Sequence, residues 1–121
     1  MIKAILTNEI LKYITEIEKN RFRVSTVKMS RSVANRLRKN SKKKSSYASN
    51  KIEGNPLSEK QVDEVIERDE RKHFLKPEQE VRNYFLALNY LEEKAKKQEK
   101  FSRKLILDVQ KYVERVHQRK R

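Results

Sequence analysis

The scarcity of turn-forming residues limits what this chain can fold into more than any other feature. Its 121 residues include one glycine and two prolines, and 40% of the residues are charged while 36% are apolar. Glycine and proline predominate in the tight turns that join strands, so a strand-rich fold is poorly provided for. Many charges with few turn residues favour helices that have solvated faces. We therefore expect an all-α fold, a small multi-helix bundle.

Charge and cysteine content restrict the classes of function. The 31 Lys and Arg against 17 Asp and Glu give a formal net charge of +14, so polyanions should be attracted. The chain has no cysteine, which excludes disulfides and thiolate chemistry. Polar residues interrupt the apolar start, so it is neither a signal peptide nor a membrane span. We expect a cytoplasmic protein with no membrane contact.

Capping residues and the spacing of apolar residues predict four helices along the chain. Thr7 predicts a helix over about 8–19, and the pair Ser58 and Gln61 forms a capping box for a helix over about 59–69. Pro77 suits the first turn of a helix that ends near 97. Ser102 caps a last helix, whose expected buried face comprises Leu105, Ile106, Val109, Tyr112, Val113 and Val116.

Most of the net charge lies in a basic segment, residues 19–51, which has twelve Lys or Arg and no acid. Its centre, "NSKKKSS", is expected to be frayed or loop-like. Such a segment suits a basic helical nucleic-acid-binding module, because cations neutralise phosphates and release counterions. Phe22 and Tyr47 are its only aromatic residues, so base stacking is poorly provided for. The basic segment therefore favours weak, non-specific binding of nucleic acid.

The stretch "SNKIEGNPLSEKQV", residues 49–62, places the only glycine directly after an acid. Gly54 is the expected left-handed stop of a helix, and Pro56 keeps that helix from resuming. Glu53 then lies at the carbonyl end, where the helix dipole opposes an anion by roughly 0.3–1 kcal/mol. This placement indicates that a group outside the helix holds the Glu53 carboxylate.

Ser49, Glu53 and Gly54 fit the pattern [ST]-x-x-x-E-[GN], and the longer run "SSYASNKIEGNPLS" resembles the inhibitory-helix segment of Fic (filamentation induced by cAMP) family proteins. Downstream, "EVRNYFLALNYL" resembles the Fic helix pattern E-V-x-N-Y-x-x-A-L, and "LTNEILKYITEIEK" is similar to the start of many Fic N-terminal regions. Together these stretches cover most of the chain in the family's order.

The resemblance implies a regulatory, autoinhibitory segment of an adenylyltransferase that moves AMP from ATP to a target hydroxyl. It implies that Glu53 pairs with a catalytic-loop arginine that would otherwise hold the ATP γ-phosphate, with Ser49 as its helical companion and Gly54 as the stop. Arginine binds carboxylate and phosphate with the same fork of donors. The implied partner is a Fic catalytic domain in cis or in trans, and the complete enzyme would use ATP and Mg.

The sequence departs from the family at the catalytic loop H-x-F-x-[DE]-G-N-G-R-x-x-R, which is absent. Neither His73 nor His117 begins such a run. We therefore expect no catalytic residue and no cofactor site in this chain. Glu114 and His117 lie one turn apart, but a lone carboxylate and imidazole do not define a metal site, so none is assigned.

We expect two parts: residues 1–57, an N-terminal region with the basic segment and an inhibitory helix over about 45–54, and residues 58–121, the truncated helical start of a Fic-like core. The alternatives are a stand-alone antitoxin-like inhibitor that supplies Glu53 in trans, and the nucleic-acid-binding module. The sequence leaves the oligomeric state open.

Overall fold

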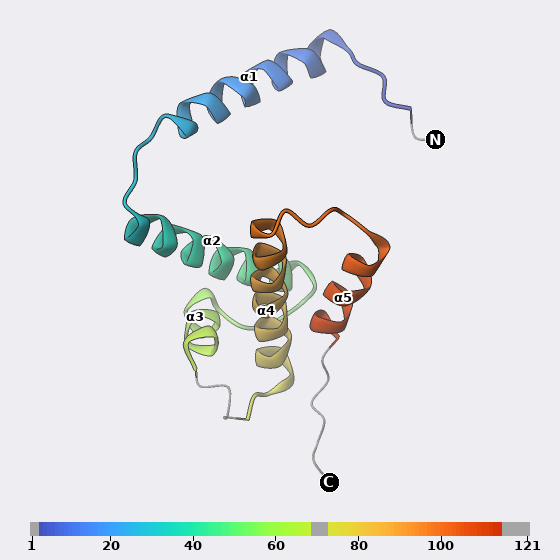
Figure 1. The fold of residues 1–121 in the computed structure, drawn as a ribbon. Coiled ribbons are helices and arrows are strands. Elements are labelled where there is room, and N and C mark those ends of the chain that lie inside the picture. The colour runs from blue at the N-terminus through green and yellow to red at the C-terminus, as the bar shows by residue number, and fades with distance from the viewer. Residues whose placement is uncertain (1–2, 69–72, 115–121) are drawn as a thin grey trace. The chain divides into compact units, whose positions relative to one another are not determined.

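The computed structural model describes residues 3–68 and 73–114, and these residues form helices and no strand (Figure 1). The all-α prediction is confirmed. In chain order the helices are α1 (Asn8–Ser25), α2 (Arg31–Ile52), α3 (Glu59–Glu67), α4 (Lys76–Lys96) and α5 (Arg103–Val113). The chain divides into two compact units, Met1–Ala34 and Asn35–Arg121. The predicted functional boundary at residue 57 concerns a different property and stays a prediction.

Helix α1 belongs to the first unit and begins where the sequence predicts. The Thr7 hydroxyl accepts a hydrogen bond from the Ile10 N–H at 3.2 Å. The helix continues to Ser25, beyond the predicted end near residue 19. A basic last turn that contains Arg23 is favourable at the negative end of the helix dipole, which helps to explain the extra length.

Three helix starts in the second unit follow the predicted signals. Ser58 and Gln61 form the capping box of α3, Pro77 lies in the first turn of α4, and the Ser102 hydroxyl accepts from the Leu105 N–H at 3.2 Å at the start of α5. Short polar side chains satisfy N–H groups that lack partners within the helix. Local sequence therefore determines these boundaries.

The apolar core of the second unit is small and centres on α3 and α4. Val62, Ile66 and Val81 are buried together, and Tyr47 of α2 and Phe85 of α4 pack against them from partly buried positions. In Figure 1, α4 lies between α3 and α5. The core thus fixes the C-terminal half of α2 against α3 and α4, which positions the end of α2.

The expectation that the "NSKKKSS" centre is frayed or loop-like is wrong, because residues 40–46 lie within the continuous helix α2. The Lys43 ammonium lies 2.7 Å from the Glu67 carboxylate of α3, and the Lys42 ammonium lies 2.6 Å from Glu92 of α4. Ser46 is fully buried and its hydroxyl donates to the Lys42 carbonyl at 2.7 Å. The two ion pairs with other helices help to stabilise a segment rich in Asn and Ser, which are poor helix formers.

The predicted buried face of α5 is only partly formed. Leu105, Val109 and Tyr112 are partly buried, but Ile106 and Val113 are exposed and no described residue of α5 is fully buried. The α5 helix packs against α4 alone among the described helices of this unit, so one side of its apolar stripe remains in solvent. Val116, also expected on this face, lies outside the described residues.

Candidate functional site

The end of α2 has the geometry that the single glycine predicts. Gly54 has φ +87°; its N–H donates to the Lys51 carbonyl at 3.0 Å, and the Asn55 N–H donates to the Asn50 carbonyl at 2.9 Å. This pair of bonds is the Schellman arrangement, in which the residue in the left-handed region is best a glycine. A Cβ at Gly54 would contact nothing within 4 Å, so backbone conformation, not space, requires glycine. Glu53 is the residue immediately before the stop.

Asn55 attaches this turn to the start of α4. Its side-chain amide donates to the Pro77 carbonyl at 2.9 Å and to the Glu80 carboxylate at 3.4 Å, while its amide oxygen accepts from the Leu57 N–H at 3.1 Å. The bond to Leu57 is a local one that asparagine often forms two residues along, and the sequence could have indicated it. The bonds to α4 depend on tertiary structure. Sequence reasoning missed Asn55 as part of the site.

A hydrogen bond of Ser49 links the last turns of α2 to the middle of α4. Its hydroxyl and the Tyr84 hydroxyl are 2.9 Å apart and hydrogen-bonded, and Ser49 is partly buried. The two residues come from the two stretches that resemble Fic sequences, "SSYASNKIEGNPLS" and "EVRNYFLALNYL". The fold therefore brings together motifs that are more than thirty residues apart in the chain.

The residues next to Tyr84 join α4 to two further helices. Arg82 is buried and donates to the carbonyls of Val65 and Arg68 at the end of α3, at 3.3 and 3.2 Å. Asn83 is also buried, and its side-chain amide donates to the Val113 carbonyl of α5 at 3.3 Å. Arg82, Asn83 and Tyr84 thus contact α3, α5 and α2 respectively. The "EVRNY" stretch is therefore where α4 is bonded to the other three helices of the second unit.

The Glu53 carboxylate is exposed, and no side chain within residues 3–68 and 73–114 forms a hydrogen bond or ion pair with it. The nearest cation in sequence, Lys51, instead donates to the Tyr47 hydroxyl at 2.8 Å. That hydrogen bond raises the pKa of Lys51. Glu53 therefore faces the helix dipole without a compensating cation from the described residues, while the backbone around it is fixed by Gly54, Asn55 and Ser49.

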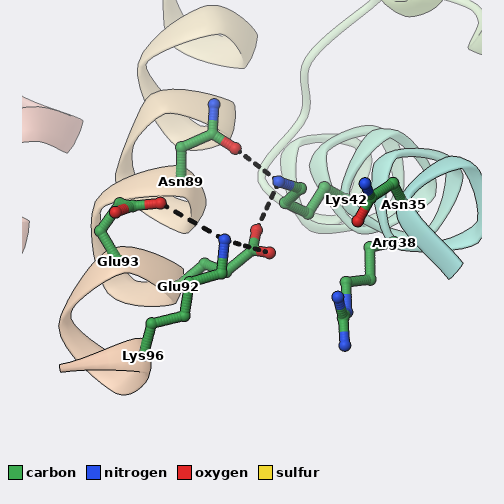
Figure 2. A pocket seen from close by; sticks show the side chains of 7 residues that line it. All are labelled: Asn35, Arg38, Lys42, Asn89, Glu92, Glu93 and Lys96. Carbon is green, nitrogen blue, oxygen red and sulfur yellow. Dashed lines mark hydrogen bonds and ion pairs between the residues drawn. The ribbon is translucent and has the colours of Figure 1, made fainter. Parts of the chain in front are cut away.

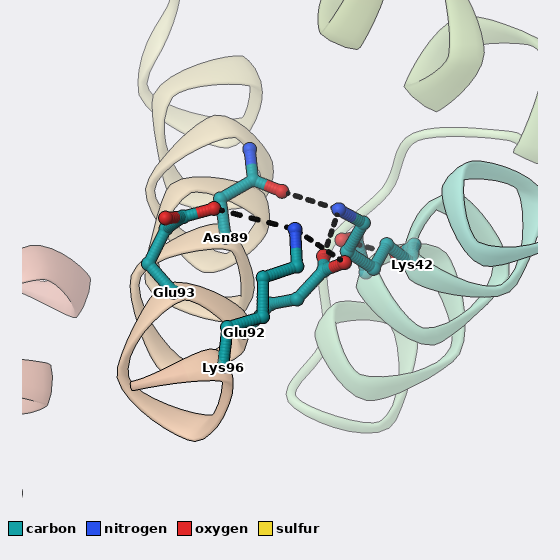
Figure 3. A network of polar contacts seen from close by, with 6 residues as sticks. Lys42, Asn89, Glu92, Glu93 and Lys96 are labelled. Atoms are coloured by element: carbon teal, nitrogen blue, oxygen red, sulfur yellow. Dashed lines mark hydrogen bonds and ion pairs between the residues drawn. The ribbon is translucent and has the colours of Figure 1, made fainter. Parts of the chain in front are cut away.

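A second polar cluster lies between α2 and α4 and is shown in Figures 2 and 3. The Lys42 ammonium donates to Asn89 at 2.7 Å and to Glu92 at 2.6 Å, and Lys96 lies 3.6 Å from Glu92 and 3.5 Å from Glu93. The hydrogen bond from Lys42 lowers the pKa of Glu92. Asn35 and Arg38 complete the lining of an open cavity of about 470 Å³. Two of its cations are already paired with acids, so the cluster joins α2 to α4 and offers little charge to a ligand.

Glu67 of α3 joins α2 in a similar way. Its carboxylate lies 2.8 Å from the Lys39 ammonium and 2.7 Å from that of Lys43. The hydrogen bonds from these two lysines lower the pKa of Glu67 to about 2. Because Glu67 and Lys39 are about half exposed, each pair contributes less than about 1 kcal/mol. Lys39, Lys42 and Lys43 of the 19–51 segment are thus used in ion pairs between helices.

Neither a metal site nor a membrane-spanning helix is found in the described part of the chain. No group of three or more potential ligands among His, Cys, Asp and Glu lies close enough together to hold a metal ion there. None of the described helices is both long and apolar enough to cross a membrane. Glu114 is exposed, and His117 lies outside the described residues, so their pairing is not placed.

Comparison with known proteins identifies no relative: no protein-family model, no curated protein and no solved structure matches this chain. The functional interpretation consequently depends on the motifs and on the geometry of the α2 end.

Proposed function

We propose that this chain is the autoinhibitory N-terminal portion of a Fic-type protein adenylyltransferase, and that Glu53 is its inhibitory residue. The observation that carries the proposal is the exposed Glu53 carboxylate, which has no partner among the described residues and lies at a helix end whose backbone is fixed on both sides. A carboxylate in that place is unfavourable by itself and becomes favourable when an external cation binds it. A charge-assisted hydrogen bond contributes roughly 1.5–3 kcal/mol, which exceeds the dipole cost.

The proposed mechanism is competition for one arginine of the partner's catalytic loop. With Glu53 bound, that arginine cannot hold the γ-phosphate, so ATP does not adopt the pose from which AMP is transferred. The fork of donors on a guanidinium fits a carboxylate as well as a phosphate. Ser49 and Asn55 do not touch the arginine in this scheme. They hold the end of α2 on α4 and so keep Glu53 in position.

The chain itself lacks the catalytic loop, so we propose that it does not transfer AMP alone and acts on a Fic catalytic domain in cis or in trans. ATP and Mg belong to the complete enzyme. If the coding sequence continues in frame past Arg121 into an H-x-F-x-[DE]-G-N-G-R run, the arrangement is in cis. A separate gene for that domain would favour the antitoxin-like arrangement.

The test is AMP transfer by a domain that carries this loop, measured with labelled ATP, with the chain fused or added. Glu53→Gln keeps the shape and deletes the charge, so it should release inhibition partly, and Glu53→Gly should release it further. Glu64→Gln is the matched control, because Glu64 is an exposed acid on α3 with no hydrogen bond or ion pair from the described residues. Unchanged transfer with both Glu53 variants folded and bound would refute the proposal.

A further inference from the structure

The apolar face of α1 is a surface that the proposed function does not use. Every residue of this helix is exposed, including Ile10, Tyr13, Ile14 and Ile17, of which Ile17 retains 62% of its accessible surface. These side chains recur at helical spacing and lie on one side of the helix, and Glu9 and Glu16 border that side along one edge. Such a continuous apolar stripe is typical of a face that another helix covers.

An isolated helix of this length also needs a partner on energetic grounds. The 18 residues of α1 are close to the length at which even favourable sequences are only marginally helical in water, since most helix stability in proteins comes from packing of the amphipathic face. The described part of the first unit contains α1, its flanking residues and the first turn of α2. It offers α1 no second helix of its own to pack against.

The distribution of charge along α1 selects the partner. Residues 8–18 of α1 carry three acids, Glu9, Glu16 and Glu18, and one base, Lys12, whereas residues 19–25 carry three bases and no acid. A second α1 in antiparallel orientation places each acidic half beside the other's basic half, and the two helix dipoles also oppose each other. A parallel pair would place the two basic segments side by side.

An anionic lipid surface fits this face less well. Helices that lie in membrane interfaces carry mainly Lys and Arg beside the apolar face, but Glu9 and Glu16 border the apolar stripe of α1 along one edge. Those acids would lie toward the headgroups. A protein partner that supplies both charge signs is favoured, and a second copy of this helix does so.

We propose that α1 is a self-association element that pairs antiparallel with α1 of a second copy of this chain. When the helices are centred near Thr15, heptad spacing places Tyr13 against Ile17 of the other copy and Ile10 against its Asn20. Glu9 then flanks Arg23 of the second copy, twice by symmetry. The same register brings the two Glu16 carboxylates close together, which is the one unfavourable contact.

Sedimentation equilibrium over a range of concentrations tests this pairing directly. The wild-type chain should form a dimer, and Ile17→Asp should abolish it. Glu9→Lys should raise the dimer dissociation constant roughly three- to tenfold, since two exposed pairs become repulsive, and adding Arg23→Glu should restore it. Glu16→Gln should strengthen the dimer. Lys12→Glu is the control, because Lys12 lies away from the contact and its reversal should change little.

Cysteine cross-linking tests the orientation, and the absence of native cysteine makes each introduced thiol unique. A mixture of Ile10→Cys and Asn20→Cys chains should form mainly the mixed disulfide, whereas a parallel pair would link Ile10→Cys to itself. A monomer at all concentrations overturns the proposal. So does a dimer insensitive to Ile17→Asp, which would place the contact elsewhere, or a monomer that binds vesicles containing phosphatidylserine through α1. Because these measurements need no catalytic domain, they are independent of the proposed inhibition.

Discussion

Replacing Asn55 with alanine should destabilise the second unit and increase the mobility of Glu53, the residue that precedes Gly54. The substitution removes the hydrogen bonds to the Pro77 carbonyl (2.9 Å), the Leu57 N–H (3.1 Å) and the Glu80 carboxylate (3.4 Å). A typical hydrogen bond contributes about 0.5–1.5 kcal/mol, and the longest of the three contributes least. We expect a loss of about 1–3 kcal/mol, which lowers the melting temperature by roughly 4–8 °C for each kcal/mol in a unit of this size.

Thermal unfolding followed by circular dichroism measures this loss, and two further variants separate its causes. Asn55→Asp keeps the acceptor for Leu57 but places a second carboxylate near Glu80, so it should be at least as destabilising as Asn55→Ala. Asn40→Ala is the control, because Asn40 is exposed on α2 and makes no described side-chain hydrogen bond. If Asn55→Ala lowers the free energy of unfolding by less than about 0.5 kcal/mol, Asn55 does not hold the end of α2 in place.

Three other consequences follow from the same contacts. Ser49→Ala and Tyr84→Phe should each destabilise the second unit, and a double-mutant cycle should give a coupling of about 0.5–1.5 kcal/mol by denaturant unfolding. A coupling near zero would mean that the 2.9 Å hydrogen bond adds nothing. The pKa of Glu67, lowered from 4.5 to about 2, stabilises the fold above pH 4.5, and this contribution is lost as the pH falls toward 2. Acid titration of unfolding should therefore show a smaller loss for Glu67→Gln, and an identical profile would contradict this. The 19–51 segment should bind duplex DNA weakly, with a steep salt dependence and no sequence preference in fluorescence anisotropy, whereas tight sequence-selective binding at physiological salt would favour the nucleic-acid alternative.

Local signals predicted the starts of α1, α3, α4 and α5 and the glycine stop of α2, because each depends on a few neighbouring residues. The start of α2 at Arg31 was not predicted, since a helix was expected only over about 45–54. Thr7, Ser58 and Ser102 cap the predicted helices, and Gly54 takes the predicted positive φ. Short side chains that bond nearby N–H groups, and a residue without a Cβ, act within a single turn. Such features can be read from the sequence without knowledge of the fold.

Features that depend on contacts between helices were not predictable in this way. The segment around Lys43 is held in its helix partly by contacts such as the ion pair with Glu67, which is far along the chain. Asn55 and Tyr84 hold the α2 end through bonds to residues that only the fold brings near. The exposure of Ile106 has the same origin, since helical periodicity marks an apolar stripe but not how much of it a neighbour covers.

The measurement that tests the central proposal most directly is a double-mutant cycle between Glu53 and the catalytic-loop arginine of a Fic domain. Isothermal titration would give the affinity of this chain for that domain in trans, for the wild-type pair, for Glu53→Gln, for the arginine changed to glutamine, and for both changes together. If the two side chains pair, the double variant should lose less than the two single losses added together, with a coupling of about 1.5–3 kcal/mol. Glu64→Gln in the same cycle should show no coupling. Losses that simply add for Glu53 as well would contradict the pairing and with it the proposed inhibition.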